Sequence, residues 1–370
     1  MFNLGEISMK KSLVALAALA AATTAFAQSS VTMFGIVDAT YAYGKSDANK
    51  RTSLTNSGLN SSRFGVRGVE DLGGGMNGSF HLEAGVNNDN GSLGATTTDN
   101  QGTASGGGGL TFNRRSTVSL GGGFGEARLG RDYTPHFWNH TFYDPFGTNG
   151  VGTTQTLGGA STALTAATGA NSNLGGPTTV RASNSIGYLL PGNLGGAFGQ
   201  VQYYLGENAS TAANKKDGNG LSFRGGYANG PISAAVALGK TNYLNANITT
   251  INFGGSYDLG VVKLSGLYDQ DKVQNGAKGR GFLFGVNAPV GAGEIRAAYS
   301  TYKVTPLAGA APSSAKIALG YVYNLSKRTA AYGTFARVSN KNGAAQALNG
   351  STGVANKAST GFDVGVRHSF

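Results

Sequence analysis

The chain has 370 residues, of which 61 are Gly and none is Cys, and its formal net charge is +11 at pH 7. The absence of Cys excludes disulfides, thiolate metal sites and cysteine nucleophiles. Disorder is excluded because 40% of the residues are hydrophobic. Only 13% are charged, against about 25% in an ordinary soluble domain. We therefore expect that part of the outer surface does not face water.

The N-terminal segment has the order of a secretory signal. Two lysines follow Met9, an apolar run covers residues 13–22, and an Ala-Phe-Ala motif ends at Ala27. We expect residues 1–27 to be a signal peptide and residues 1–8 to lie upstream of the natural start. The alternative, a membrane anchor, is disfavoured because the apolar run is shorter than the ~20 residues that span a bilayer.

The mature chain, residues 28–370, alternates between apolar and polar positions with a period of two. Phe80 and Leu82, for example, alternate with His81 and Glu83, and the same pattern recurs down to the C-terminus. Strict alternation indicates half-buried β-strands. Long helices are disfavoured because Gly is frequent and evenly spread, at a cost of about 1 kcal/mol for each Gly in a helix interior. The sequence therefore predicts an all-β fold.

Short turns alternate with long polar loops along this part of the chain. The short turns, rich in Gly, Pro and Asn, lie at residues 71–75, 121–123, 191–193, 229–231, 258–260, 289–291 and 324–326. The long loops lie near residues 44–57, 87–110, 132–178, 207–218, 242–248, 271–279, 304–314 and 339–358. This alternation predicts sixteen antiparallel strands, with both termini at the short-turn end. Such a sheet removes its exposed edges by closing into a barrel with an aqueous lumen.

The polar face of the predicted strands is made of Ser, Thr, Asn and Gly rather than the dense Lys and Glu of a water-exposed surface. This favours an inverted barrel whose apolar face points outward, into a membrane. Aromatic residues cluster near the predicted strand ends, as interfacial girdles do: Tyr41, Tyr43, Phe124, Tyr188, Tyr203, Tyr257, Tyr268, Phe282, Tyr299, Tyr321, Tyr323 and Phe335. The alternative is the aromatic core of a β-sandwich.

Four segments together resemble the trimeric general porins of Gram-negative bacteria, and most of all the beta-proteobacterial branch. They are residues 28–37 (QSSVTMFGIV), 62–73 (SRFGVRGVEDLG), 112–115 (FNRR) and 365–370 (GVRHSF). The resemblance implies a sixteen-stranded transmembrane β-barrel in the outer membrane, with short periplasmic turns and long extracellular loops. It also implies a homotrimer surrounded by outer-membrane lipid and lipopolysaccharide.

In this family the third long loop, here residues 132–178, folds into the lumen and narrows it. The segment Asp144-Pro145-Phe146-Gly147 resembles the tip of that constriction loop, whereas residues 153–177 depart from a compact loop and have no predicted place. The resemblance further implies that the C-terminal Phe370 is read by the outer-membrane assembly machinery. The alternative is an ordinary aromatic residue of the last strand.

The expected lumen carries an excess of positive charge. Strict alternation turns Arg63, Arg67, Arg115 and Arg128 inward. The resemblance adds Arg181 and also Arg114, which we expect to turn inward through a bulge. Glu83 on a neighbouring strand and Asp144 on the third loop oppose them. Arg suits anion recognition because it stays charged and presents a planar fork to carboxylate or phosphate. The alternative is that these arginines only satisfy lumen carboxylates and loop carbonyls.

Catalytic and nucleic-acid functions find little support. His136 and His140 are four residues apart and would suit a metal only on a helix with a third ligand nearby, but they lie in a Pro-containing loop. No serine motif, phosphate loop or basic run with interleaved aromatics is present, so we expect no enzyme activity, cofactor, metal or nucleic acid. The sequence predicts a channel for passive diffusion of small hydrophilic solutes that favours inorganic and organic anions. The alternatives are a barrel that serves surface recognition through its loops and, third, an outer-membrane hydrolase.

Overall fold

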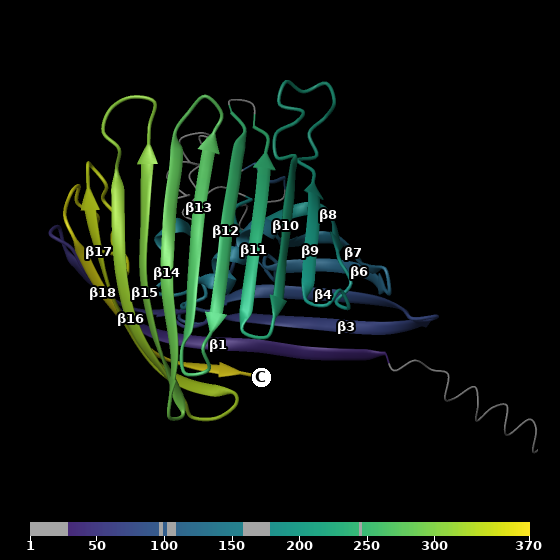
Figure 1. Cartoon of the computed structure of the whole chain (residues 1–370), viewed down its shortest axis with the longest axis horizontal. Coiled ribbons are helices and arrows are strands. Elements are labelled where there is room, and N and C mark those ends of the chain that lie inside the picture. Colours follow the sequence, from purple (N-terminus) through teal and green to yellow (C-terminus); the bar gives the residue numbers. More distant parts are fainter. Residues whose placement is uncertain (1–28, 96–98, 102–108, 158–177, 244–245) are drawn as a thin grey trace, which may run out of the picture.

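The computed structural model describes residues 29–95, 99–101, 109–157, 178–243 and 246–370. The predicted signal peptide, residues 1–27, lies outside them. The described chain forms one continuous antiparallel sheet (Figure 1). Among the described residues, no helix has the length and the apolar character that crossing a membrane requires.

The strands, in chain order, are β1 (Ser30–Lys45), β2 (Lys50–Asn56), β3 (Arg63–Gly73), β4 (Met76–Asn87), β5 (Ser92–Leu93), β6 (Arg115–Gly122), β7 (Gly125–Tyr133), β8 (Arg181–Leu189), β9 (Ala197–Tyr204), β10 (Gly220–Asn229), β11 (Ile232–Thr241), β12 (Ile248–Asp258), β13 (Lys263–Val273), β14 (Lys278–Val290), β15 (Gly293–Thr305), β16 (Ser313–Asn324), β17 (Thr329–Lys341) and β18 (Ser359–Ser369). The helix α2 (Pro135–Tyr143) lies in the connection from β7 to β8.

The sheet closes on itself. β1 pairs with β18 on one side and with β3 on the other, so its strands form a ring without a free edge. At the seam, the Phe370 backbone N–H donates to the Gly35 carbonyl oxygen at 3.0 Å, and the Gly35 N–H donates to the Phe370 carbonyl oxygen at 3.1 Å. When the short pieces β2 and β5 are set aside, sixteen strands complete the ring. The prediction of a sixteen-stranded antiparallel barrel is confirmed.

All seven predicted short turns join consecutive strands of the ring, and the long connections lie at the opposite end (Figure 1). The β3–β4 turn needs glycine, because Gly73, Gly74 and Gly75 all have positive φ. Two expected loops contain short strands. Within residues 87–110, β5 pairs with the end of β4 at Val86↔Leu93 and Asn87↔Ser92. Within residues 44–57 the structure has β2, which pairs with β1 from Ala39↔Asn56 to Lys45↔Lys50 and so extends the hairpin beyond the predicted strand end.

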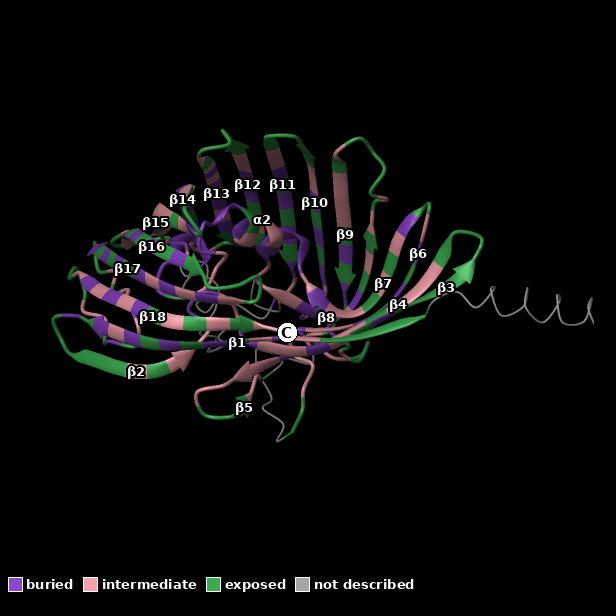
Figure 2. Cartoon of the chain, turned by 90° about the horizontal axis from the view of Figure 1, so that it is seen from below, coloured by how far each residue is buried: buried purple, intermediate pink, exposed green. Residues whose placement is uncertain are grey.

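The barrel is apolar outside and polar inside. Figure 2 shows buried and exposed residues alternating along the strands. On β13, Tyr268 is 44% exposed on the outer face, whereas Asp269 and Asp271 are buried on the inner face. All of the predicted girdle aromatics except Tyr43 are exposed. The predicted inverted arrangement is therefore present, and a sandwich core is not.

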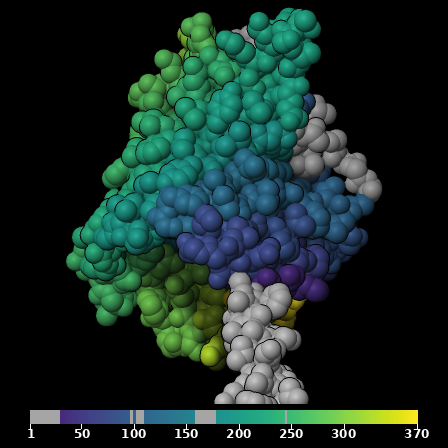
Figure 3. All heavy atoms as spheres, turned by 90° about the vertical axis from the view of Figure 1, so that its right-hand side faces the viewer, coloured from purple at the N-terminus to yellow at the C-terminus, as the bar shows by residue number. Residues whose placement is uncertain are grey.

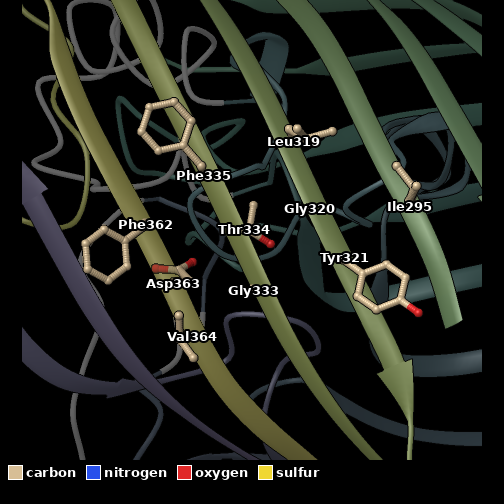
Figure 4. A pocket seen from close by; sticks show the side chains of 10 residues that line it. All are labelled: Ile295, Leu319, Gly320, Tyr321, Gly333, Thr334, Phe335, Phe362, Asp363 and Val364. Atoms are coloured by element: carbon tan, nitrogen blue, oxygen red, sulfur yellow. The ribbon is translucent and has the colours of Figure 1, made fainter.

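The wall is continuous also where distant parts of the chain meet. Figure 3 shows the purple and blue strands of the first part of the chain beside the teal strands, with the yellow C-terminal end near the purple start. The outer face has a hollow of about 520 Å³ between Tyr321, Phe335 and Val364 (Figure 4). It exists because Gly333, which pairs with Tyr321 and Val364, carries no side chain there. This hollow opens outward and is no part of the lumen.

The helix α2, in the described part of the connection from β7 to β8, lies inside the ring of strands (Figure 2). Its last residue, Tyr143, is 2% exposed and packs against Ala235, Leu267 and Leu283 of the inner wall. The inward-facing Gly254 leaves the space for the Tyr143 ring, because a Cβ atom there would overlap the ring. The first part of the expected third loop is therefore inside the lumen, whereas residues 158–177 lie outside the described residues.

The packing of α2 gives a prediction. Gly254→Ala forces the Tyr143 ring and α2 away from the wall, so we expect the protein to lose about 1–3 kcal/mol of stability and its channel conductance to change. Thermal unfolding in detergent and single-channel recording measure the two effects. The control is Gly255→Ala on the outer face, where the new Cβ would meet its nearest atom at 3.4 Å. Equal behaviour of the two variants would contradict this role of Gly254.

Candidate functional site

Glu83 on the inner face of β4 is the centre of a cluster of basic side chains. The Arg114 Nε donates to Glu83 Oε1 at 2.5 Å, and Arg63 Nη1 lies 3.5 Å from the same oxygen. His81 Nε2 lies 3.4 Å from Glu83 Oε2. The Glu83 side chain is only 7% exposed, so these contacts replace the water that it has lost. One carboxylate thus serves two guanidinium groups.

Tyr133, where β7 ends and the third loop begins, brings a third arginine to this cluster. Its hydroxyl oxygen accepts hydrogen bonds from Arg114 Nη2 at 2.6 Å and from Arg181 Nη2 at 2.8 Å. The Arg181 guanidinium also lies over the Tyr133 ring, 4.3 Å from its centroid. We call Arg63, Arg114 and Arg181 the arginine triad. Three positive charges are held together against the single carboxylate of Glu83.

Neighbouring residues of a regular strand face opposite sides of the sheet, yet Arg114 and Arg115 both face inward. The local backbone explains why. Arg115 pairs with Glu83 in the regular ladder, and Arg114 lies one residue before that ladder begins. The expected bulge is therefore not what turns Arg114 inward; its N–H still donates to the Glu83 carbonyl oxygen at 3.1 Å. A register shift between β7 and β8 lies just before the pair Tyr133↔Arg181.

The triad borders a cavity of about 300 Å³ between the barrel wall and the third loop. The wall side is basic, whereas the loop contributes Tyr133, Trp138, Thr141 and Thr148. The two sides therefore differ in character, since one presents positive charge and the other presents rings and hydroxyl groups.

A second group of inward charges is balanced. Arg128 Nη1 lies 2.6 Å from Asp132 Oδ2, and Arg128 Nη2 lies 2.8 Å from Glu126 Oε1. Arg115 Nε lies 3.5 Å from Asp132 Oδ1. Two arginines and two carboxylates compensate one another here. Arg115, although inward as expected, thus belongs to a neutral group and does not join the triad.

Two further predicted site residues lie apart from the triad. Arg67 is on β3, and its guanidinium is 5.3 Å from the centroid of the Phe34 ring. It is four residues from Arg63, or about 13 Å along the strand towards the short-turn end. Asp144 is 5% exposed and does not line the cavity.

The position of Asp144 corrects its expected role. Its carboxylate accepts N–H hydrogen bonds from Thr154 at 2.9 Å, Phe146 at 3.0 Å and Thr148 at 3.2 Å. Burial raises the pKa of this carboxyl group, and the three N–H donors oppose the rise. A residue that looked like the acidic tip of the loop instead holds the loop's own backbone together.

Residues that the sequence analysis did not single out fasten the third loop to the wall. The Val151 N–H donates to Asp363 Oδ2 at 2.7 Å, and Lys316 Nζ donates to the Val151 carbonyl oxygen at 3.2 Å. Asn139 of α2 donates to Asn252 Oδ1 at 2.8 Å. Lys316 could have been noticed, because it is an isolated lysine on the inward face of a strand. Tyr133 carried no comparable signal.

The two histidines lie on α2, and not in an irregular loop as expected. His136 Nδ1 is 2.9 Å from Ser222 Oγ, and His140 Nε2 is 3.1 Å from Asp269 Oδ1. Their partners differ, and within the described ranges no group of three His, Cys, Asp or Glu side chains could hold a metal. Burial lowers the pKa of His136 to about 3 and that of His140 to about 4. Both imidazoles are therefore neutral at neutral pH.

The buried His136 predicts an acid-sensitive fold. Its pKa of about 3 lies below the value of about 6.5 in an unfolded chain. Between these pH values the unfolded chain takes up a proton that the folded protein does not, so stability falls as the pH falls. The slope from this group reaches about 1.4 kcal/mol per pH unit. The groups around it are Ser222, Thr134 and His140.

We expect the stability of His136→Asn to depend less on pH than that of the wild type between pH 6.5 and 4. The reason is that the Asn amide does not protonate in this range. Thermal unfolding midpoints in detergent at a series of pH values measure it. The matched control is His368→Gln, which removes a histidine from the exposed outer face and should keep the wild-type slope. An unchanged slope in His136→Asn would show that this histidine is not the acid-sensitive group.

Comparisons with known proteins agree with this architecture. The profile of the Gram-negative porin family matches residues 13–343. Outer membrane porin protein 32 of Delftia acidovorans is 40% identical, over 98% of this chain and 100% of the relative. An outer membrane porin of Bordetella pertussis is 29% identical over 98% and 100% of the two chains.

Solved structures are similar too. An anion-selective porin from Comamonas acidovorans has a TM-score of 0.80 and 36% identity, over 93% of this chain and 100% of that one. A trimer form of OmpT from Vibrio cholerae has a TM-score of 0.62 over 92% and 99% of the chains. At 13% identity, this second likeness concerns the fold alone.

Proposed function

The chain belongs to the Gram-negative porin family, and we propose that the arginine triad gives its water-filled channel a preference for anions. Membership of the family makes the protein an outer-membrane β-barrel channel and not an enzyme. Small hydrophilic solutes and ions pass by diffusion. The size of the lumen at the third loop limits what passes, and the field of the lumen charges decides between anions and cations.

The observation that carries the proposal is the uneven charge at the cavity. Arg63 and Arg114 share the Glu83 carboxylate and Arg181 is hydrogen-bonded to the neutral Tyr133 hydroxyl, whereas Arg115 and Arg128 have two carboxylates. An anion about 6 Å from a guanidinium group gains roughly 3 kcal/mol at an effective dielectric constant near 20, and less in a wet pore. Salt screens the field over ~8 Å, which confines the effect to the narrow part of the lumen. The anion-selective porin from Comamonas acidovorans, 36% identical, supports this proposal.

Charge removal at the triad tests it. We expect Arg181→Gln to lower the ratio of anion to cation permeability about fivefold, the equivalent of about 1 kcal/mol. The measurement is the zero-current potential of the protein in planar bilayers across a KCl gradient. Arg181→Lys, which keeps the charge, should retain most of the preference.

Arg337→Gln removes the same charge from the exposed outer face and serves as the control. Equal selectivity of Arg181→Gln and the wild type would contradict a role of Arg181 in anion preference. A cation-signed zero-current potential in the wild type would overturn the proposed preference for anions. Absence of channel current from the folded protein would favour the alternative of a barrel that serves surface recognition.

We also propose that three copies assemble, as the resemblance implies. A trimer form exists for the Vibrio cholerae OmpT, whose fold is similar. We further propose that Phe370 is the signal that the outer-membrane assembly machinery reads. Its ring is 47% exposed at the short-turn end, where machinery on the periplasmic side could reach it.

The outward face near the long loops fits a membrane with anionic headgroups, and we propose that it contacts lipopolysaccharide. The exposed cations there lie at strand ends, above the apolar band: Lys240, Lys272, Arg280, Lys303, Arg337 and Lys341. Lys240 and Lys272 both pair with Thr249, and Arg280 pairs with Lys303, so neighbouring strands bring them side by side. In the part of the chain that the structure describes, none of these cations forms an ion pair.

The proposed export route gives one more prediction. If residues 1–27 are the signal peptide, the protein isolated from outer membranes begins at Gln28. N-terminal sequencing or intact mass measures this directly. A mature protein that begins upstream of Gln28 would contradict the proposed cleavage after Ala27.

A further inference from the structure

The loop side of the cavity carries a row of aromatic rings. The centroids of the Tyr133 and Trp138 rings are 5.0 Å apart, and those of Trp138 and Phe142 are 5.4 Å apart in a stacked arrangement. We call Tyr133, Trp138 and Phe142 the aromatic row. Tyr133 and Trp138 line the cavity. Phe142 is 56% exposed, although α2 lies inside the barrel.

An arginine lies over each end of this row. The Arg181 guanidinium is 4.3 Å from the centroid of the Tyr133 ring, and the Arg224 guanidinium is 5.0 Å from that of Phe142. Arg224 is held in place by Asn139 of α2, whose Oδ1 accepts from its Nε at 2.7 Å. The row therefore runs from the arginine triad to a further arginine on β10.

These rings are unusual for a passage that only has to admit water and small ions. Water-facing residues elsewhere on the inner wall are mostly small and polar, whereas Trp138 and Phe142 present apolar faces to the lumen. Exposed apolar rings beside positive charge complement a ligand that has both a flat apolar part and a negative group. The cavity of about 300 Å³ is at the lower end of the range for small-molecule sites.

We propose that the constriction binds aromatic carboxylates, with the ring against Trp138 and the carboxylate on the arginine triad. This deepens the proposed anion channel and rests on it, because the ligand must reach the cavity through the lumen. Arg224 at the far end of the row is buried between the Phe142 and Phe198 rings, so the carboxylate site is assigned to the triad alone. The fit is to a flat ring with a negative charge, so an aliphatic acid of the same size should gain only the charge contact.

Benzoate and cyclohexanecarboxylate separate the two contributions. Both have seven carbons and one carboxylate, but only benzoate has a planar π-system. With chloride carrying the current through single channels in planar bilayers, we expect each acid to interrupt the current. Benzoate should remain bound about two- to twelvefold longer than cyclohexanecarboxylate. This range corresponds to the free energy of one aromatic ring pair.

Trp138→Leu tests the ring directly, because it keeps apolar bulk and removes the indole. Its benzoate residence time should fall to that of cyclohexanecarboxylate, and its zero-current potential in KCl should keep its anion sign because Trp138 carries no charge. Docking of α2 uses other side chains, among them the buried Asn139 and Tyr143. A residence time of cyclohexanecarboxylate equal to that in the wild type would show that the loop and the triad have kept their places. The matched control is Phe282→Leu on the outer face, where the ring is 49% exposed.

The outcomes distinguish this proposal from the anion preference on which it rests. Equal residence times of the two acids in the wild type would overturn the aromatic site and leave the anion channel intact. A benzoate preference that survives in Trp138→Leu would overturn the assignment to the aromatic row. A cation-signed potential in KCl with no interruption by either acid would overturn both.

Discussion

The structure depends on the pairing of every strand in a closed ring. Inside a membrane no water reaches the backbone, so each N–H and C=O group of a spanning segment needs a partner within the protein. The pairing of β1 with β18, completed by the hydrogen bonds between Gly35 and Phe370, supplies the last of these partners. Because the ring is closed and the outer face carries an apolar band, the polar side chains at the depth of that band face inward. The lumen and its charges follow from that constraint.

An inward-facing polar wall also gives the third loop something to bind. Asn139, Val151 and the buried histidines of α2 meet wall side chains such as Asn252, Asp363 and Ser222. Gly254 leaves room for Tyr143 at the same wall. The loop is therefore fixed by the barrel it narrows, and Tyr133 at its root can hold Arg114 and Arg181 in one place.

The fold and part of the site were predictable because both signals are local. A period of two and glycine-rich turns fixed the strand count, and alternation alone turned Arg63 and Arg115 inward. Where the backbone leaves the regular ladder, alternation fails: Arg114 precedes β6, and Tyr133 and Arg181 follow a register shift. The nine residues of α2 are too few to form a stable helix alone. Packing against the wall stabilises them, which is why His136 and His140 looked like loop residues.

Counting charges would not have identified the triad, because what matters is which carboxylate each arginine meets. Arg115 and Arg128 face the lumen, yet Glu126 and Asp132 cancel their field. Glu83 alone cannot cancel three guanidinium groups, and the carboxylate of Asp144 accepts three backbone N–H hydrogen bonds away from the triad. The hydroxyl of Tyr133 satisfies hydrogen-bond donors of Arg114 and Arg181 without neutralising them. A tyrosine in place of a second acid therefore leaves positive charge beside the cavity and adds the ring on which the aromatic row begins.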